Sequence, residues 1–361
     1  MVRQRCGSRA WLYNGVQPLQ PGETCIRTFN LCIVGLGNVG KAFVALLRKK
    51  EQALRDGHGI IWRVTGVASR RLGWLVVPEG FTPERVLSAD FSEAQRAGDV
   101  REWLRLGKAD AVFEASSLNA TTGQPATDYI RAALAAGALA ISANKGPIVH
   151  AWRSLTELAV AKNRRFLHES AMMDGVPTFS LFRETLPAIE VRGFRGILNS
   201  TTTVILDAMG AGMSLDDAVH EAQRLGAAET DPSLDVDGVD AAVKVVGLTT
   251  VLMNGNLKLE DVRRQGIRAI GREQLRAAQA GGETWRLVSR ARRQPDGPIT
   301  ASVAPERLQA DDPLSTVRGT SLLISFETDI FPELIIGERD PGPQATAYGL
   351  LADFISAVRS A

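Results

Sequence analysis

The sequence predicts an α/β fold in which a doubly wound parallel sheet is followed by a second, α+β domain. Three observations support this prediction. Apolar runs typical of buried strands alternate with helical patterns from Thr28 to about residue 170. After about residue 170, longer helices and short β-like runs replace the alternation. The chain of 361 residues also exceeds the usual size of one hydrophobic core, so two domains are expected.

The first domain is expected over residues 28–170. An apolar strand begins at Thr28 and runs into glycines, and a helical pattern follows it. A polar stretch, 79–108, separates the second predicted strand from the third. The predicted elements are strands at 28–34, 60–69, 109–116 and 138–144 and helices at 41–54 and 127–137.

The second domain is expected over residues 171–341, and a last helix within 342–361 is expected to pack back on the first domain and complete it. Residues 1–27 are expected to form a flexible extension, because glycines and prolines interrupt any amphipathic helix there. The predicted elements of the second domain are a strand at 191–199, helices at 204–212, 214–226 and 237–254, and β-like runs at 285–290, 300–304, 320–328 and 333–337.

Composition and charge exclude several classes of protein. Charged residues make up 23% of the chain with a net charge of +2, and the two signs are interspersed, so nucleic acid is not an expected partner. No apolar run approaches the roughly 18–20 residues that span a membrane. Three cysteines, Cys6, Cys25 and Cys32, show no disulfide or zinc spacing, which fits a reducing cytoplasm.

A glycine-rich turn after the first strand indicates a dinucleotide site. It reads Gly35-Leu-Gly37-Asn38-Val39-Gly40, with an apolar strand before it and a helix after it. In such a turn the first glycine permits the bend, the second admits a pyrophosphate and the third lets helix and strand pack closely. This setting predicts a Rossmann-type domain, and a tight turn without a ligand is the alternative.

The end of the second strand predicts which cofactor binds. An acid there would bond the ribose hydroxyl of NAD, whereas this chain has Arg70 and Arg71. Two guanidinium groups suit a phosphate, so NADP is favoured over NAD; solvated arginines are the alternative. Ser116 and Ser117, after the third strand, are also assigned to the cofactor.

Lys145 directly follows the fourth strand, in the segment Ala143-Asn-Lys-Gly-Pro147. Open α/β sheets bind ligands at the carboxyl ends of their strands. Lys145 is therefore expected to face the nicotinamide ribose, a substrate carboxylate or both; a surface lysine is the alternative.

The segment 227–244 concentrates acidic residues and ends in one lysine. A calcium loop aligned on Asp235 and Asp237 would place Lys244 at the twelfth position, where a glutamate is required, so that motif is excluded. Asp240 and Lys244 share one helix face. The remaining alternatives are acids that stabilise a helix start and a pocket for an ammonium group. Five carboxylates lie within twelve positions: Glu229, Asp231, Asp235, Asp237 and Asp240.

Six motifs from about Thr28 to the end of the chain belong together in order and spacing. They are GLGNVG at 35–40, SANKGP at 142–147, HESAMMDGVP at 168–177, GILNSTTTVIL at 196–206, EAQRLGAAETDPSLDVDGVDAAVK at 221–244 and GPQATAYGLLADFI at 342–355. With these motifs the chain resembles homoserine dehydrogenase, in a short form without a C-terminal regulatory domain. The resemblance implies NAD(P)-linked interconversion of L-homoserine and L-aspartate 4-semialdehyde, in threonine and methionine biosynthesis, by a homodimer or a dimer of dimers.

The resemblance also implies roles for individual residues. Lys244 would move the proton beside Asp240, and Lys145 would lie where cofactor and substrate meet. Glu229 and Asp235 would hold the substrate ammonium, Asn199, Ser200 and Thr201 would line the cleft, and Gly342 would lie near the cofactor. A structural sodium ion would be bound, mainly by backbone oxygens, at Glu169, Met172, Asp174 and Val176.

Three departures from the family pattern affect the predicted pocket. Ser200 replaces a glycine, Met172-Met-Asp174 replaces mostly small residues, and Asp340-Pro341 precede Gly342. A dehydrogenase for another amino or hydroxy acid is therefore the second hypothesis, and a non-catalytic NADP-binding sensor is the third. No regulatory domain is expected after the final helix.

Overall fold

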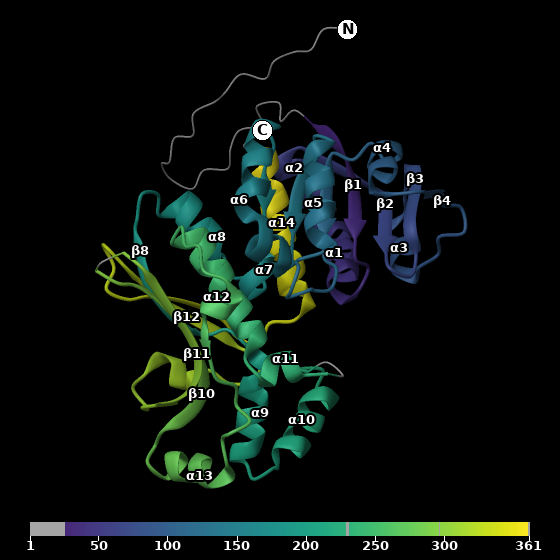
Figure 1. Ribbon diagram of the computed structural model, residues 1–361. Coiled ribbons are helices and arrows are strands. Elements are labelled where there is room, and N and C mark those ends of the chain that lie inside the picture. The colour runs from purple at the N-terminus through teal and green to yellow at the C-terminus, as the bar shows by residue number, and fades with distance from the viewer. Residues whose placement is uncertain (1–25, 229–230, 296, 360–361) are drawn as a thin grey trace.

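The computed structural model describes residues 26–228, 231–295 and 297–359, which form two sheets with helices packed on them (Figure 1). The first sheet has seven strands in the order β4-β3-β2-β1-β5-β6-β7. Its strands are β1 Arg27–Val34, β2 Ile60–Ser69, β3 Gly73–Phe81, β4 Gln95–Ala97, β5 Ala111–Glu114, β6 Leu139–Ser142 and β7 Phe166–Leu167.

The predicted parallel sheet is confirmed for five strands. β1 runs parallel to β2 and β5, β5 to β6, and β6 to β7. The crossover helices are α1 Asn38–Lys49, α2 Glu51–His58, α3 Pro83–Ser88, α4 Val100–Leu106, α5 Ala126–Ala135 and α6 Lys145–Ala161. The helix expected at 41–54 is two helices, which meet at Lys50.

Two antiparallel strands at the edge of this sheet were not predicted. β3 pairs antiparallel with β2, and β4 pairs antiparallel with β3. Gly73, with φ +70°, lets the chain reverse within a few residues of Ser69. The stretch 79–108 was considered only polar, yet it contains the end of β3, β4 and two helices. The elements α3, β4 and α4 are only 3 to 7 residues long, too short to show a periodic apolar pattern.

The second sheet has six strands in the order β13-β12-β8-β10-β11-β9. Its strands are β8 Val191–Ile197, β9 Arg263–Arg264, β10 Thr284–Arg293, β11 Ile299–Leu308, β12 Leu322–Thr328 and β13 Leu334–Glu338. The remaining helices are α7 Ser170–Met173, α8 Thr178–Ser180, η1 Leu181–Thr185, α9 Ser200–Gly210, α10 Leu215–Arg224, α11 Ser233–Val236, α12 Val239–Leu252, η2 Leu259–Asp261, α13 Arg272–Ala280, η3 Pro313–Thr316 and α14 Pro343–Arg359.

Helix α12 lies between the two halves of the molecule and is buried nearly all round. It packs on α6 on one side and on β10 and β11 on the other. Nine of its residues are buried, which fits its apolar sequence. The helix therefore holds its polar side chains at the junction between the two sheets.

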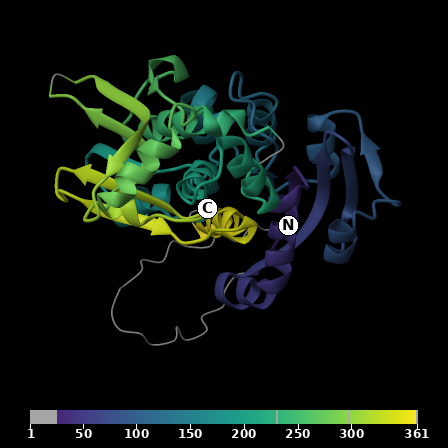
Figure 2. The same cartoon turned by 90° about the horizontal axis from the view of Figure 1, so that it is seen from below.

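The C-terminal helix α14 returns from the second sheet to the first, as predicted (Figures 1 and 2). It packs on α1, and its buried Phe354 makes edge contacts with Phe29 at 5.4 Å and Phe113 at 5.5 Å between ring centroids. Among the helices of the described residues, none is long and apolar enough to cross a membrane.

Candidate active site

The glycine turn has the geometry of a phosphate cradle. Gly35 has φ +93°, and a Cβ there would lie 2.4 Å from the carbonyl oxygen of Ala115. A Cβ at Gly40 would lie 2.0 Å from the carbonyl oxygen of Gly35. Gly37, by contrast, has no atom within 4 Å of its Cβ position, and no side chain caps helix α1, which begins at Asn38. Gly35 and Gly40 are therefore needed for close packing. Gly37 leaves open space in front of the N–H groups at the start of α1, including that of Val39, so the turn fits a pyrophosphate.

Arg70 and Arg71 lie in the exposed turn between β2 and β3, at the carboxyl end of β2. The same edge of the sheet carries the glycine turn after β1. Gly342, just before α14, is also exposed, with no atom within 4 Å of its Cβ position. The structure thus places the arginines where an adenosine ribose would lie in a doubly wound sheet.

A buried carboxylate, Glu114, organises the ends of β5 and β6. It accepts hydrogen bonds from the backbone N–H of Ser116 at 2.8 Å, from the Ser116 hydroxyl at 2.5 Å and from the Ser142 hydroxyl at 2.8 Å. Burial raises the pKa of Glu114 despite these donors. Sequence analysis missed this residue, although a glutamate at the end of an apolar strand was a visible signal.

Asn144 connects this network to Lys145. Its side chain donates to the carbonyl oxygens of Ser116 at 3.1 Å and Ser117 at 3.4 Å and accepts from the N–H of Gly146 at 2.9 Å. Asn144 is the N-cap of α6, and Lys145 is the first residue of that helix. The segment is thus a capped helix start and not the surface loop that was the alternative, and the position of Lys145 is fixed by the bonds around it.

Asp240 bridges two lysines that come from different halves of the chain. Its carboxylate lies 3.1 Å from Nζ of Lys145 on α6 and 3.7 Å from Nζ of Lys244 one turn along α12. The three side chains are only 13–19% exposed. Lys244 also donates to the carbonyl oxygen of Leu198 at 2.5 Å. The packing of α12 on α6 brings together the three residues that sequence analysis assigned to the chemistry.

Asn199 joins this lysine cluster to a second carboxylate. Its side-chain nitrogen donates to Asp235 at 2.6 Å and to Asp240 at 3.1 Å. Its oxygen accepts from the N–H of Thr202 at 2.9 Å, which caps α9. Asn199 therefore holds the two aspartates in fixed positions from the start of a helix.

The other residues predicted near the cleft fall into three groups. Thr201 turns away from the cluster, because its hydroxyl donates to the carbonyl oxygen of Ala227 at 2.7 Å, while Ser200 begins α9 and is half-buried. Asp237 pairs with Arg268 at 2.5 Å, away from the lysines. Glu229 lies outside the described residues.

The electrostatics of the cluster favour a charged Asp240. Burial alone would raise the pKa of Asp240, but Lys145 and Lys244 outweigh burial and bring it well below its usual range. Burial would lower the pKa of Lys145, but Asp240 reverses this and the net shift is upward. Burial, followed by the charge of Asp240, raises the pKa of Asp235. A cation bound beside Asp235 would stabilise its charged form and so counteract the increase in pKa that burial and Asp240 cause.

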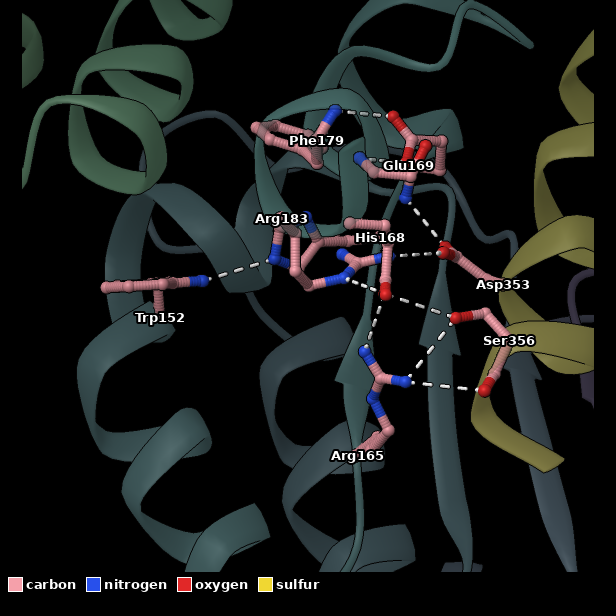
Figure 3. A network of polar contacts seen from close by, with 10 residues as sticks. Trp152, Arg165, His168, Glu169, Phe179, Arg183, Asp353 and Ser356 are labelled. Carbon is pink, nitrogen blue, oxygen red and sulfur yellow. Dashed lines mark hydrogen bonds and ion pairs between the residues drawn. The ribbon is translucent and has the colours of Figure 1, made fainter. Parts of the chain in front are cut away.

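The segment 169–176, assigned to a sodium ion, lies between β7 of the first sheet and β8 of the second. The Glu169 carboxylate accepts from the N–H groups of Phe179 at 2.6 Å and Ser180 at 2.7 Å, and the backbone N–H of Glu169 donates to Asp353 of α14 at 2.7 Å (Figure 3). Burial, followed by the charge of Glu169, raises the pKa of Asp353 to about 7. The Glu169 carboxylate is thus occupied by backbone donors.

One of the three departures from the family pattern, Met172-Met-Asp174, lies in this segment. Met172 is accommodated by Gly247 of α12, where a Cβ would lie 2.0 Å from the Met172 methyl group. Asp174 has φ +49° and accepts a hydrogen bond from the Thr346 hydroxyl at 2.9 Å, and Val176 is buried. The described residues contain no group of three or more His, Cys, Asp or Glu side chains arranged to hold a metal.

Comparison with known proteins gives consistent matches. The model of the homoserine dehydrogenase family matches residues 177–355. An NAD(+)-dependent homoserine dehydrogenase of Pseudomonas canavaninivorans is 33% identical over 341 residues, which cover 92% of this chain and 97% of the relative. A homoserine dehydrogenase of Sulfurisphaera tokodaii is 34% identical over 325 residues, 90% of this chain and 97% of the relative. A hyperthermophilic archaeal homoserine dehydrogenase in complex with NADPH superimposes with a TM-score of 0.78 at 27% identity, covering 93% and 99% of the two chains.

Proposed function

The chain belongs to the homoserine dehydrogenase family of NAD(P)-dependent oxidoreductases, and we propose that the cluster of Lys145, Asp240 and Lys244 is its catalytic centre. The proposal rests on the position of Asp240, whose carboxylate holds two lysine ammonium groups at 3.1 Å and 3.7 Å in a largely buried cluster. The reaction is the interconversion of L-homoserine and L-aspartate 4-semialdehyde.

In the proposed site, Lys244 exchanges the proton of the substrate hydroxyl. In the direction of reduction, the Lys244 ammonium donates a proton to the aldehyde oxygen while the carbon receives a hydride, which leaves the alcohol and a neutral amine. In the direction of oxidation, the neutral amine of Lys244 accepts the hydroxyl proton of homoserine while the carbon loses a hydride and becomes an aldehyde. Bound NADP or NAD would supply the hydride acceptor at its nicotinamide ring. Asp240 and the Leu198 carbonyl hold the Lys244 nitrogen, which restricts the direction of proton transfer.

The ends of the substrate would be held by groups of opposite charge. Asp235, whose pKa is raised by burial and by Asp240, gains from an ammonium group beside it. Glu229 is its proposed partner, and Asn199 keeps Asp235 in place. Lys145 is proposed for the substrate carboxylate, together with Ser200 and the backbone of Thr201 at the start of α9, because the Thr201 hydroxyl is bonded to Ala227.

The proposed cofactor is NADP, with NAD as a second acceptor. The relatives include an NAD(+)-dependent enzyme and a structure in complex with NADPH, so the family accommodates both. The exposed arginines at the end of β2 favour the cofactor that carries the additional phosphate. The residues proposed to hold it are Gly35, Gly37, Asn38, Val39, Gly40, Arg70, Arg71, Ser116, Ser117, Lys145 and Gly342.

The remaining parts of the proposal concern assembly and the sodium ion. We place the cofactor domain at 28–170 with 342–361, the substrate and dimerisation domain at 171–341, and the homodimer in the cytoplasm. A sodium ion at 169–176 would take backbone carbonyl oxygens, because the Glu169 carboxylate is bonded to two N–H groups.

Steady-state kinetics with L-homoserine and both cofactors test the function. The formation of NADPH or NADH is followed by absorbance, with L-serine and L-malate as control substrates. We expect L-homoserine to give the highest kcat/KM by at least about tenfold, since a pocket built for polar groups discriminates strongly. A higher kcat/KM for another amino or hydroxy acid would mean that this acid, and not L-homoserine, is the substrate. No turnover with any substrate would support a non-catalytic NADP sensor.

A further inference from the structure

The turn between β2 and β3 is held by a hydrogen bond between its two ends. The hydroxyl of Ser69 accepts a hydrogen bond from the N–H of Leu72 at 3.2 Å. Gly73 closes the turn with φ +70°, a conformation that favours glycine. Arg70 and Arg71 occupy the tip and are both exposed. Their backbone is therefore ordered while their guanidinium groups remain accessible.

A third arginine reaches the same turn from the strand that sequence analysis missed. In the pairing of β3 with β4, Arg96 lies opposite Leu75. Its Nη1 donates to the carbonyl oxygen of Leu72 at 2.9 Å. The same nitrogen lies 3.4 Å from the position of a Cβ on Gly73. The Arg96 guanidinium thus lies directly against the turn, although 24 residues separate it from Leu72.

Six of the other arginines between residues 26 and 170 pair with carboxylates, and five form no ion pair within the described residues. Arg48 pairs with Glu84 at 3.0 Å, Arg105 with Glu102 at 3.6 Å and Arg131 with Asp128 at 3.2 Å.

By contrast, Arg70, Arg71 and Arg96 form no ion pair with any carboxylate of the described residues. Arg96 uses one N–H for Leu72, and a guanidinium has five. The turn therefore concentrates positive charge and free donors without a counterion.

We propose that Arg96 is a specificity-determining residue, which forms with Arg70 and Arg71 a binding site for the 2′-phosphate of NADP. The proposal rests on the cofactor site proposed above and adds to it a residue from β4. A guanidinium group can donate two parallel hydrogen bonds to phosphate oxygens, and such charge-assisted hydrogen bonds are stronger than those between neutral groups. The bond to Leu72 fixes both the guanidinium and the turn, so the phosphate meets a site that needs little reorganisation.

Binding of two nucleotide fragments tests the proposal without any turnover. Adenosine 2′,5′-diphosphate and adenosine 5′-diphosphate differ in the 2′-phosphate, and isothermal titration of the full chain measures both. We expect the native protein to bind the 2′,5′-diphosphate at least about tenfold more tightly, and Arg96→Ala to remove most of that difference. The affinity for the 5′-diphosphate should change less than about twofold.

Two further variants separate recognition from folding. Arg96→Lys keeps the positive charge but cannot donate two parallel hydrogen bonds, so it should retain part of the preference for the 2′,5′-diphosphate. Arg55→Ala is the matched control, because Arg55 is an exposed arginine of α2 beside the opposite end of β2, and it should leave both affinities unchanged. Melting temperatures of all variants show whether the fold is intact.

The proposal is overturned if Arg96→Ala weakens both fragments equally, because Arg96 would then only support the turn. It is also overturned if the native protein shows no preference for the 2′,5′-diphosphate. Neither result affects homoserine turnover with NAD, which remains the test of the proposed function. A preference that persists in Arg96→Ala but disappears in Arg70→Ala would restrict the site to the turn itself.

Discussion

The molecule carries two groups of charged residues that differ in burial and pairing. At the junction of the two sheets, Lys145, Asp240 and Lys244 are at most 19% exposed and pair with one another. At the turn after β2, the guanidinium groups of Arg70 and Arg96 are exposed and form no ion pair within the described part of the chain.

This difference suggests a division of work. Charges in a half-buried pocket interact strongly and have a fixed geometry, which suits proton transfer. Charges on the surface are screened and adaptable, but they can bind a phosphate that supplies the missing counterion. We expect substitutions in the buried group to change the rate of the reaction and those in the exposed group to change the choice of cofactor.

The largest effect is expected for Lys244→Ala. It removes the proposed proton acceptor, and general acid–base catalysis contributes roughly 10²–10⁴-fold. We predict that kcat falls by that order with either cofactor, while the dissociation constant of NADPH, measured by fluorescence, stays within about twofold. A decrease in kcat below tenfold would show that another group moves the proton.

The next largest effect is expected for Asp240→Asn. It leaves two ammonium groups close together without their carboxylate. Charge-assisted hydrogen bonds contribute about 1.5–3 kcal/mol, so kcat/KM should fall roughly ten- to hundredfold. The variant should also lower the pKa of Lys145, because Asp240 is what raises it. The alkaline limb of the pH profile of kcat/KM should move to lower pH; an unchanged limb would mean that Lys145 does not contribute to that profile.

Arg70→Ala should have an intermediate effect confined to one cofactor. The loss of one guanidinium should weaken NADPH binding by about tenfold and leave NADH binding unchanged, because only NADPH carries the 2′-phosphate. The measurement is titration of both reduced cofactors, with Arg55→Ala as the control. Equal weakening of both cofactors would remove Arg70 from the phosphate site.

The smallest effect concerns a buried acid whose burial outweighs the arginines beside it. Asp353 is 2% exposed, lies 3.9 Å from Arg183, and its pKa is raised to about 7 by burial and by Glu169. The folded state therefore holds a proton that the unfolded state releases near pH 4, so the stabilisation is complete below pH 4 and is lost as the pH rises to about 7. The slope reaches about 1.4 kcal/mol per pH unit.

Asp353→Asn should flatten this slope, because the amide does not titrate. Urea unfolding at pH 5, 6, 7 and 8 measures the free energy of unfolding of both proteins. The native protein should lose stability relative to the variant between pH 5 and 7. Parallel curves across that range would show that Asp353 keeps an ordinary pKa.

Local patterns made much of the fold and the catalytic group predictable. The glycine turn, the strands on either side of it and the spacing of Asp240 and Lys244 on one helix are all short-range features of the chain. Lys145 was placed near the site because parallel strands end at a common edge. The resemblance to homoserine dehydrogenase then implied that Lys145, Asp240 and Lys244 take part in one site.

Contacts between distant segments were not predictable in the same way. Glu114 bonds Ser142 across 28 positions, and Arg96 reaches Leu72 only because β4 pairs with β3. The elements α3, β4 and α4 are only 3 to 7 residues long, so the stretch 79–108 gave no periodic signal. Asp174 adopts φ +49°, and sequence analysis had no basis for expecting that conformation in an aspartate.

The division between the two charged groups is tested most directly by measuring kcat and the ratio of NADPH to NADH affinities in Lys244→Ala and Arg70→Ala side by side, with L-homoserine as substrate. We predict that Lys244→Ala lowers kcat with both cofactors and leaves the affinity ratio unchanged, whereas Arg70→Ala lowers the ratio and leaves kcat with NAD unchanged. The account would be contradicted if either variant changed both quantities, or if each changed the quantity assigned to the other.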